Sequence, residues 1–216
     1  MTQPTGIRIA INVMRARLTI VGFIIAIVSF QISTLFNIDG GIALPGVNNG
    51  VHIRADMALF VALALSVISL ICFIGSSTMD ELGACDHWLF VVGDLLMYLA
   101  LASAITGFFM PLTEQFSLIA MQAPMHKSQL AMFRLAIVTL GSIAWFAAVY
   151  LGPIVSLLRS PFSKKTNISL RFGYLALLVG LFWFNHQVLL FEASYLPKPL
   201  PGQGNYWYEL LQPLTW

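Results

Sequence analysis

The sequence predicts an all-α, polytopic membrane protein: one domain, residues 1–216, that forms a bundle of five transmembrane helices with one or two interfacial amphipathic helices. Three observations predict this fold class. Hydrophobic residues make up 58% of the chain and charged residues only 9%. The mean hydropathy is +0.84. Five separate apolar stretches are each long enough to cross a bilayer, and no long polar linker divides them.

The first predicted span covers residues 18–36. Before it, Arg8, Asn12 and Arg15 share one helical face while apolar side chains take the other, which predicts an interfacial amphipathic helix. The second span covers residues 55–74. It follows a polar loop whose Gly-Gly and Asn-Asn-Gly steps indicate turns.

The third predicted span, residues 87–110, is expected to end at Pro111, because proline interrupts a helix. Apolar residues recur at helical spacing within residues 112–129, which predicts a short helix lying on the membrane surface. The fourth span, residues 130–157, is long enough to be tilted, or bent near Pro153.

The fifth predicted span covers residues 172–191. The tail that follows, residues 195–216, is rich in proline and aromatic residues. Aromatic rings favour the headgroup region of a bilayer. We therefore expect the tail to form a re-entrant or surface-lying flap, or else a docking strip for another subunit.

Small residues at four-residue spacing indicate which helix faces pack closely inside a bilayer. They occur on the second span at Ala58, Ala62 and Ser66, and on the third at Ala100, Ser103, Ala104 and Gly107. These two faces are predicted to be buried.

Basic residues beside the spans predict the orientation, because Lys and Arg near short loops stay on the cytoplasmic side. They gather before the first span and between the fourth and fifth spans, at Arg8, Arg15, Arg17, Arg159, Lys164, Lys165 and Arg171. Five spans put these two segments on the same side. We therefore expect a bacterial inner membrane, with the N-terminus in the cytoplasm and the C-terminus on the outer, periplasmic side.

The charge of Asp94 is unfavourable inside a bilayer, because placing a charged side chain near the bilayer centre costs a free energy on the order of 3 kcal/mol. It lies roughly 10 Å into the third span, counted from His87. His87 and Tyr98 share its side of the helix. One interpretation is a station in a proton or cation path, with His87 as the relay and Tyr98 as a hydrogen-bond partner. The other is a neutral or hydrogen-bonded carboxyl that fixes helix packing against a Ser or Thr.

A second polar layer is predicted near the outer face from depth alone. Its members are Gln31, Asp56, Glu114, Arg134, Asn185, His186 and Glu192. Glu192 or Asp56 is the expected partner of Arg134. The layer is interpreted either as an outward-facing binding site or exit half-channel, in which Arg134 sets charge selectivity and His186 titrates, or as a snorkelling arginine beside a hydrogen-bonded histidine.

Other partners and chemistries are disfavoured. The formal charge of +2 is small and the basic residues form no run, so nucleic acid is not an expected partner. No P-loop or nucleophile elbow is present, which favours a non-enzymatic protein. Cys72 and Cys85 are expected to be reduced thiols.

No cofactor is predicted. A bis-histidine haem site needs two imidazoles at the same depth, whereas His87 and His186 are predicted near opposite faces. His52 and His126 lie in predicted outer loops without the spacing of metal ligands. Haem and metal are therefore both disfavoured.

Two functions remain open. The first is a non-enzymatic membrane subunit or assembly partner, which meets the lipid bilayer and either other membrane subunits or further copies of itself. The alternative is a small oligomeric channel or proton-coupled carrier that uses Asp94 on the inner side and Arg134 with His186 on the outer side. A haem-binding membrane subunit is a more distant alternative.

Overall fold

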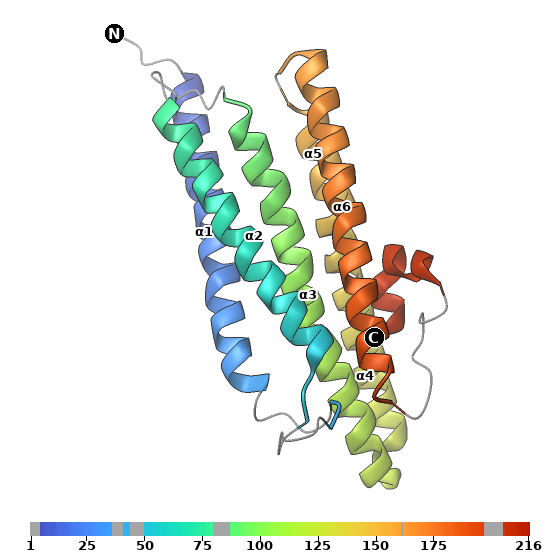
Figure 1. Ribbon diagram of the computed structural model, residues 1–216. Coiled ribbons are helices and arrows are strands. Elements are labelled where there is room, and N and C mark those ends of the chain that lie inside the picture. The colour runs from blue at the N-terminus through green and yellow to red at the C-terminus, as the bar shows by residue number, and fades with distance from the viewer. Residues whose placement is uncertain (1–4, 36–40, 44–49, 80–86, 161, 197–204) are drawn as a thin grey trace.

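The computed structural model is a bundle of long helices that run alternately in opposite directions (Figure 1). It describes residues 5–35, 41–43, 50–79, 87–160, 162–196 and 205–216. The α-helices are α1 (Thr5–Leu35), α2 (Ile53–Met79), α3 (Leu89–Gln122), α4 (Lys127–Phe146), α5 (Gly152–Leu158) and α6 (Lys164–Ala193). The short elements are η1 (Pro124–His126), η2 (Ala147–Leu151) and η3 (Tyr206–Thr215). Among the described residues, five helical stretches, with α4, η2 and α5 counted as one, are long and apolar enough to cross a membrane, which confirms the predicted number and order.

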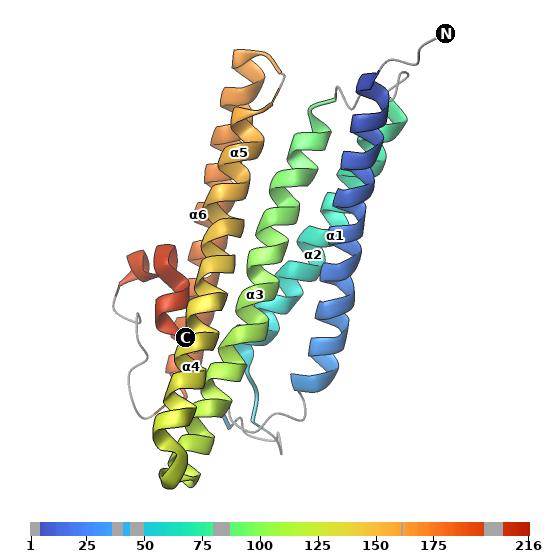
Figure 2. The same cartoon turned by 180° about the vertical axis from the view of Figure 1, so that it is seen from behind.

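Helix α3 is the centre of the bundle. It contacts α1, α2, α4, α5 and α6, and 61% of its most apolar stretch is buried, against 17% for α6. Seen from both sides, α1 and α2 lie on one flank of α3 and α4, α5 and α6 lie on the other (Figures 1 and 2). Outer helices such as α6 are apolar and yet largely exposed. Helices of this kind are typical of a bundle surrounded by lipid.

The predicted small-residue faces pack against each other where α2 meets α3. Ala62 and Ser66 of α2 are fully buried, as is Ala100 of α3. At Gly107, an added Cβ would lie 2.6 Å from the Leu59 side chain, so glycine is needed for this close approach. The packing prediction is therefore confirmed for this helix pair.

The prediction that Pro111 ends the third span is wrong, because α3 continues through Pro111 to Gln122. The expected surface helix is thus the last part of α3. Hydroxyl groups bond main-chain oxygens beside the proline: Thr113 donates to the oxygen of Met110 (2.8 Å) and Ser117 to that of Thr113 (2.9 Å). Proline removes one internal hydrogen bond, but in apolar surroundings a full break of the helix would leave more main-chain groups unpaired, so a helix tolerates proline there.

Two other helix boundaries differ from expectation. Helix α1 runs without a break from Thr5, so no separate interfacial helix precedes the span in the described residues. Helix α6 begins at Lys164, so Lys164, Lys165 and Arg171 belong to the helix and not to a loop. Ser163 caps this start by accepting the Thr166 main-chain N–H at 3.3 Å, which satisfies one of the unpaired donors at a helix N-terminus.

The fourth span is irregular at the predicted place. The π-helical turn η2 directly precedes Gly152 and Pro153. The Tyr174 hydroxyl donates to the Val149 main-chain oxygen within this turn. A π-turn shifts the hydrogen-bond ladder by one residue and commonly accompanies a bend.

The C-terminal tail folds back along the bundle. The Tyr206 hydroxyl donates to the Val179 main-chain oxygen of α6 (3.0 Å), and Tyr150 of η2 donates to the Leu210 main-chain oxygen (2.8 Å). Trp216 stacks on Phe109 of α3 with ring centroids 6.1 Å apart. The inner face of η3 is therefore occupied by the chain itself.

Candidate functional site at the end of the bundle

A cavity of about 270 Å³ opens at the end of the bundle where α2 and α4 begin and where α3 and α6 finish. Four charged side chains line it: Arg54, Glu114, Arg134 and Glu192. The rest of its wall is largely apolar and includes the ring of Trp216. We refer to this space as the end cavity.

One side of the end cavity is built by the chain that enters α2. Ile42 and Val51 form an antiparallel bridge with two main-chain hydrogen bonds of 3.0 Å. Beside it, Gly41 has φ +75°, and an added Cβ would lie 2.6 Å from the Val51 oxygen, so the turn requires glycine. This conformation directs the Gly41 N–H to Glu114, which accepts it at 3.1 Å.

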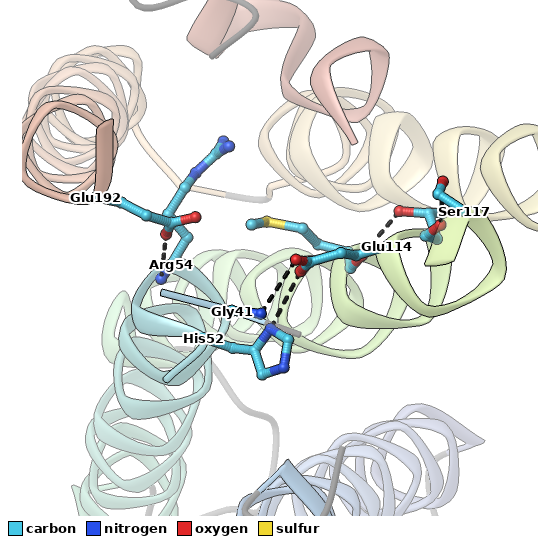
Figure 3. Close-up of polar contacts among 8 residues, drawn as sticks. Gly41, His52, Arg54, Glu114, Ser117 and Glu192 are labelled. Carbon is cyan, nitrogen blue, oxygen red and sulfur yellow. Dashed lines mark hydrogen bonds and ion pairs between the residues drawn. The ribbon is translucent and has the colours of Figure 1, made fainter. Parts of the chain in front are cut away.

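Glu114 and Glu192 point toward the start of α2 from opposite sides (Figure 3). His52 contributes Nδ1, which lies 3.2 Å from the second carboxylate oxygen of Glu114. Glu192 accepts the Arg54 main-chain N–H at 3.1 Å. Because Arg54 lies in the first turn of α2, its N–H has no partner within the helix, and the carboxylate also interacts favourably with the helix dipole.

The arginines of the cavity are not paired as the sequence suggested. Glu192 caps α2 instead of binding Arg134, and Asp56 does not line the cavity. Arg134 is exposed and donates from Nη2 to the Trp216 main-chain oxygen at 3.3 Å. Arg54 is buried, and its charge interacts with those of Glu192 and Glu209. The prediction of a direct ion pair for Arg134 is therefore wrong, although Arg134 and Glu192 do line one cavity.

His186 and Asn185 belong to a different polar group, formed with the tail. His186 Nδ1 lies 3.8 Å from a carboxylate oxygen of Glu209, and its ring packs against Tyr206. Gln212 accepts from Thr106 (3.1 Å) and donates to Glu209 (3.4 Å). Asn185 lines a small pocket beside Gln212.

Burial of Glu209 disfavours its charged form and raises the pKa of this carboxyl, and the charge of Arg54 opposes that rise in part. The single outer layer predicted from depth is therefore divided between the end cavity and this tail group. Gln31 is buried in α1.

Asp94 lies in the opposite half of the bundle and joins three helices. It is buried in α3, forms an ion pair with Arg17 of α1, including an Nη2 to Oδ2 contact of 3.2 Å, and accepts from Ser156 of α5 at 2.7 Å. A serine is the kind of partner expected if the carboxyl fixes helix packing. The arginine was not foreseen.

The predicted partners of Asp94 make other contacts. His87 accepts the Leu89 main-chain N–H at 3.3 Å and its ring lies beside Trp88. The ring of Tyr98 packs directly against Gly152. In the described part of the chain neither residue forms a hydrogen bond to Asp94, so the hydrogen bond expected from Tyr98 is not formed. The relay through His87 stays a prediction.

Metal-binding potential is limited in the described residues, where no group of three or more His, Cys, Asp or Glu side chains is placed to hold a metal ion. Cys72 is a half-buried free thiol of α2. Cys85 lies outside the described residues.

Sequence reasoning missed the roles of Gly41, Arg54 and Glu209. The Gly-Gly step did mark a turn, but a turn signal does not say which acceptor its N–H will meet. Glu209 and Gln212 were missed because the tail was interpreted from its proline and aromatic residues, as a flap or a docking strip, and its polar residues were assigned no partners. Comparison with protein-family models, with curated proteins and with solved structures finds no match to this chain.

Proposed function

We propose that this chain is a non-enzymatic integral membrane subunit that assembles with other membrane protein chains, and that the outer face of its C-terminal tail forms the contact. The observation that carries the proposal is how far the tail reaches. Tyr206 bonds Val179, which lies near the middle of α6 and about 20 Å from either end of that helix at 1.5 Å per residue. If α6 crosses a bilayer, the start of η3 lies at the depth of the hydrocarbon.

The outward side of the tail is apolar but poorly suited to lipid. Trp207, Tyr208 and Leu214 are 68%, 49% and 63% exposed. The 3₁₀-helix they belong to follows the exposed Asn205 and is interrupted at Leu211, whose φ and ψ are non-helical. Lipid offers no hydrogen-bond partner to irregular main chain, so such segments are found at membrane depth where protein covers them. A neighbouring chain would supply that cover.

Contacts inside the bundle favour a subunit over an enzyme. Asp94 is held by Arg17 and Ser156, and Glu192 caps α2. Each of these carboxylates connects separate helices, and no catalytic nucleophile and base are paired among the described residues.

Photo-cross-linking in native membranes tests the proposal. A photoreactive amino acid in place of Trp207 should form adducts with another protein chain. The matched control is Phe23, which is 65% exposed on α1. Helix α1 lies on the flank of the bundle opposite the tail (Figure 2), so the same amino acid at Phe23 should react mainly with lipid. Lipid adducts alone at position 207 would contradict the proposal.

A small channel or proton-coupled carrier is the second candidate, and the end cavity is the observation that favours it. Arg134 and Glu192 line that cavity near one end of the bundle, while Asp94 lies in the other half. In proteoliposomes, Asp94→Asn should abolish proton-linked flux. Unchanged flux in this variant, or no flux in the unmodified protein, would remove the carrier hypothesis.

A further inference from the structure

The end cavity offers more hydrogen-bond donors than the protein itself uses. A guanidinium has five N–H donors. Arg134 donates to the Trp216 main-chain oxygen, and among the described residues no hydrogen bond is formed by the guanidinium of Arg54, which is buried and lines the cavity. Donors without acceptors in a partly enclosed space favour an incoming group that is rich in oxygen atoms.

The carboxylates of Glu114 and Glu192 balance the positive charge of the two arginines, but among the residues that the structure describes they accept no hydrogen bonds from the guanidinium groups. Glu114 already accepts from Gly41 and contacts His52, and Glu192 accepts from the Arg54 main chain. The hydroxyls of Thr113 and Ser117 donate to main-chain oxygens. The unused hydrogen-bonding capacity of the wall is therefore mostly that of the two guanidiniums.

Two arginines from different helices suit a tetrahedral oxyanion. A planar carboxylate is satisfied by one guanidinium fork, whereas a phosphate has oxygens directed toward donors on several sides. The apolar part of the wall, including Met110, Leu196 and Trp216, provides a surface for a hydrocarbon portion of the same ligand.

The depth of the cavity points to the same chemistry. Helix α6 is about 45 Å long, which exceeds the roughly 30 Å hydrocarbon core of a bilayer. About 8 Å of helix therefore extends beyond the hydrocarbon at each end. Glu192 lies in that extension, and Arg134, about 10 Å from the start of α4, lies at its boundary. This is the level at which the phosphates of phospholipids occur.

We propose that the end cavity is a phosphate-binding site in which the guanidiniums of Arg54 and Arg134 are the principal donors. The phosphate belongs either to the headgroup of an anionic phospholipid or to a soluble phosphate compound. Thr215 and Trp216 of the tail line this site, but the proposal does not rest on the contact proposed above for the outer face of the tail.

Thermal unfolding of the full chain in lipid-free detergent tests this site. Phosphatidic acid and diacylglycerol of the same acyl chains differ only by the phosphate, and inorganic phosphate at constant ionic strength represents the soluble source. Phosphatidic acid should raise the unfolding temperature by several degrees, and diacylglycerol should not. Stabilisation by inorganic phosphate as well would support a soluble source, whereas its absence would support a lipid headgroup.

Variants separate specific binding from general charge effects. Arg134→Gln should weaken the apparent affinity for phosphatidic acid at least tenfold. Arg171→Gln, at an exposed arginine near the other end of the bundle, should leave it unchanged. Arg54→Gln should reduce binding further, and if this buried variant fails to fold, Arg134→Gln decides alone. Equal stabilisation by phosphatidic acid and diacylglycerol, or wild-type affinity in Arg134→Gln, would overturn the proposal.

Discussion

The main-chain conformation and the close contacts at Gly41 require glycine. Its φ of +75° lies in the left-handed region, and a Cβ would collide with the Val51 main chain. Gly41→Ala should therefore cost about 1–3 kcal/mol of stability, and it should also disturb the N–H that Glu114 accepts. Thermal unfolding in detergent measures the loss.

Gly173→Ala is the matched control. Gly173 lies inside α6 and nothing lies within 4 Å of an added Cβ. Alanine favours a helix over glycine by up to about 1 kcal/mol, so this variant should be as stable as the unmodified protein or more so. Equal losses at both positions would contradict the role assigned to the Gly41 turn.

Arg134 shows why single partners are hard to predict from sequence. Depth along a helix follows from residue number, and it correctly placed Arg134 and Glu192 near one end of the bundle. The direction in which a side chain points around the bundle depends on how the helices pack. Glu192 instead accepts a hydrogen bond from the main-chain N–H at the start of α2. A pattern of charged residues in the sequence does not reveal such a main-chain donor.

At the scale of elements, Asp94 fastens α1 and α5 to the central helix. Asp94→Asn should cost about 3 kcal/mol, because it leaves the partly buried Arg17 without its counter-charge. Adding Arg17→Gln should recover part of that loss, since the unpaired charge is then removed. Unfolding measurements on both single variants and the double variant give the coupling.

Additive losses in this cycle would mean that Arg17 and Asp94 do not stabilise one another. The same measurements serve as the folding control for the flux experiment, because a loss of flux is informative only if Asp94→Asn remains folded in the membrane.

Helix ends were less predictable than helix existence. Five apolar stretches follow directly from composition and length. Pro111 was expected to end a span, but it removes only one internal hydrogen bond, and a break of α3 in apolar surroundings would leave more main-chain groups unpaired. The irregular turn η2 occurs beside Pro153, where a bend was one of the two expectations. It accepts a hydrogen bond from Tyr174 of α6, a contact that local sequence does not reveal.

Attachment of the tail should depend on pH through Glu209. Burial raises the pKa of Glu209 in the docked tail, with partial opposition from Arg54; His186 also faces this carboxyl. The docked state therefore binds the proton more tightly than a released tail does. Docking is strongest below the usual glutamate pKa of about 4.3 and weakens as pH rises through the raised value.

Limited proteolysis between pH 4 and pH 8 measures this effect. Cleavage within the tail should increase with pH in the unmodified protein, and Glu209→Gln should flatten the dependence because glutamine does not titrate. A protease whose own activity is calibrated at each pH on an unfolded peptide is required. A pH dependence that survives in Glu209→Gln would show that another group controls the tail.

At the scale of the whole molecule, the predicted layering by depth is partly recovered, while the grouping within a layer is not. Asp94 lies in one half of the bundle, and Arg134 and Glu192 lie near the far end. Within that second half, however, His186 faces the tail and Arg134 faces the end cavity. Depth is a one-dimensional property of a span, whereas a binding site also requires the angular positions that helix packing determines.

The distribution of the basic residues predicts the orientation of the bundle. The cations Arg159, Lys164 and Lys165 are exposed at one end of the bundle, and we predict that this end lies in the cytoplasm. At the other end, Arg54 is buried and Arg134 bonds Trp216, so neither is a free loop charge. In the described structure, the exposed basic residues Arg159, Lys164 and Lys165 therefore still gather at the end of the bundle that the sequence predicts to be cytoplasmic.

Single cysteines report this orientation, once Cys72 and Cys85 are replaced by alanine. Met125 of η1 is 93% exposed at the end-cavity side, and Ser163 is exposed directly before α6 at the other. In intact cells, Met125→Cys should react with a membrane-impermeant maleimide, and Ser163→Cys should react only after the membrane is permeabilised. The reverse pattern would invert the orientation. Labelling of both from outside would mean that the α4–α5 stretch does not cross the bilayer, and the depth assigned to the end cavity would then fail with it.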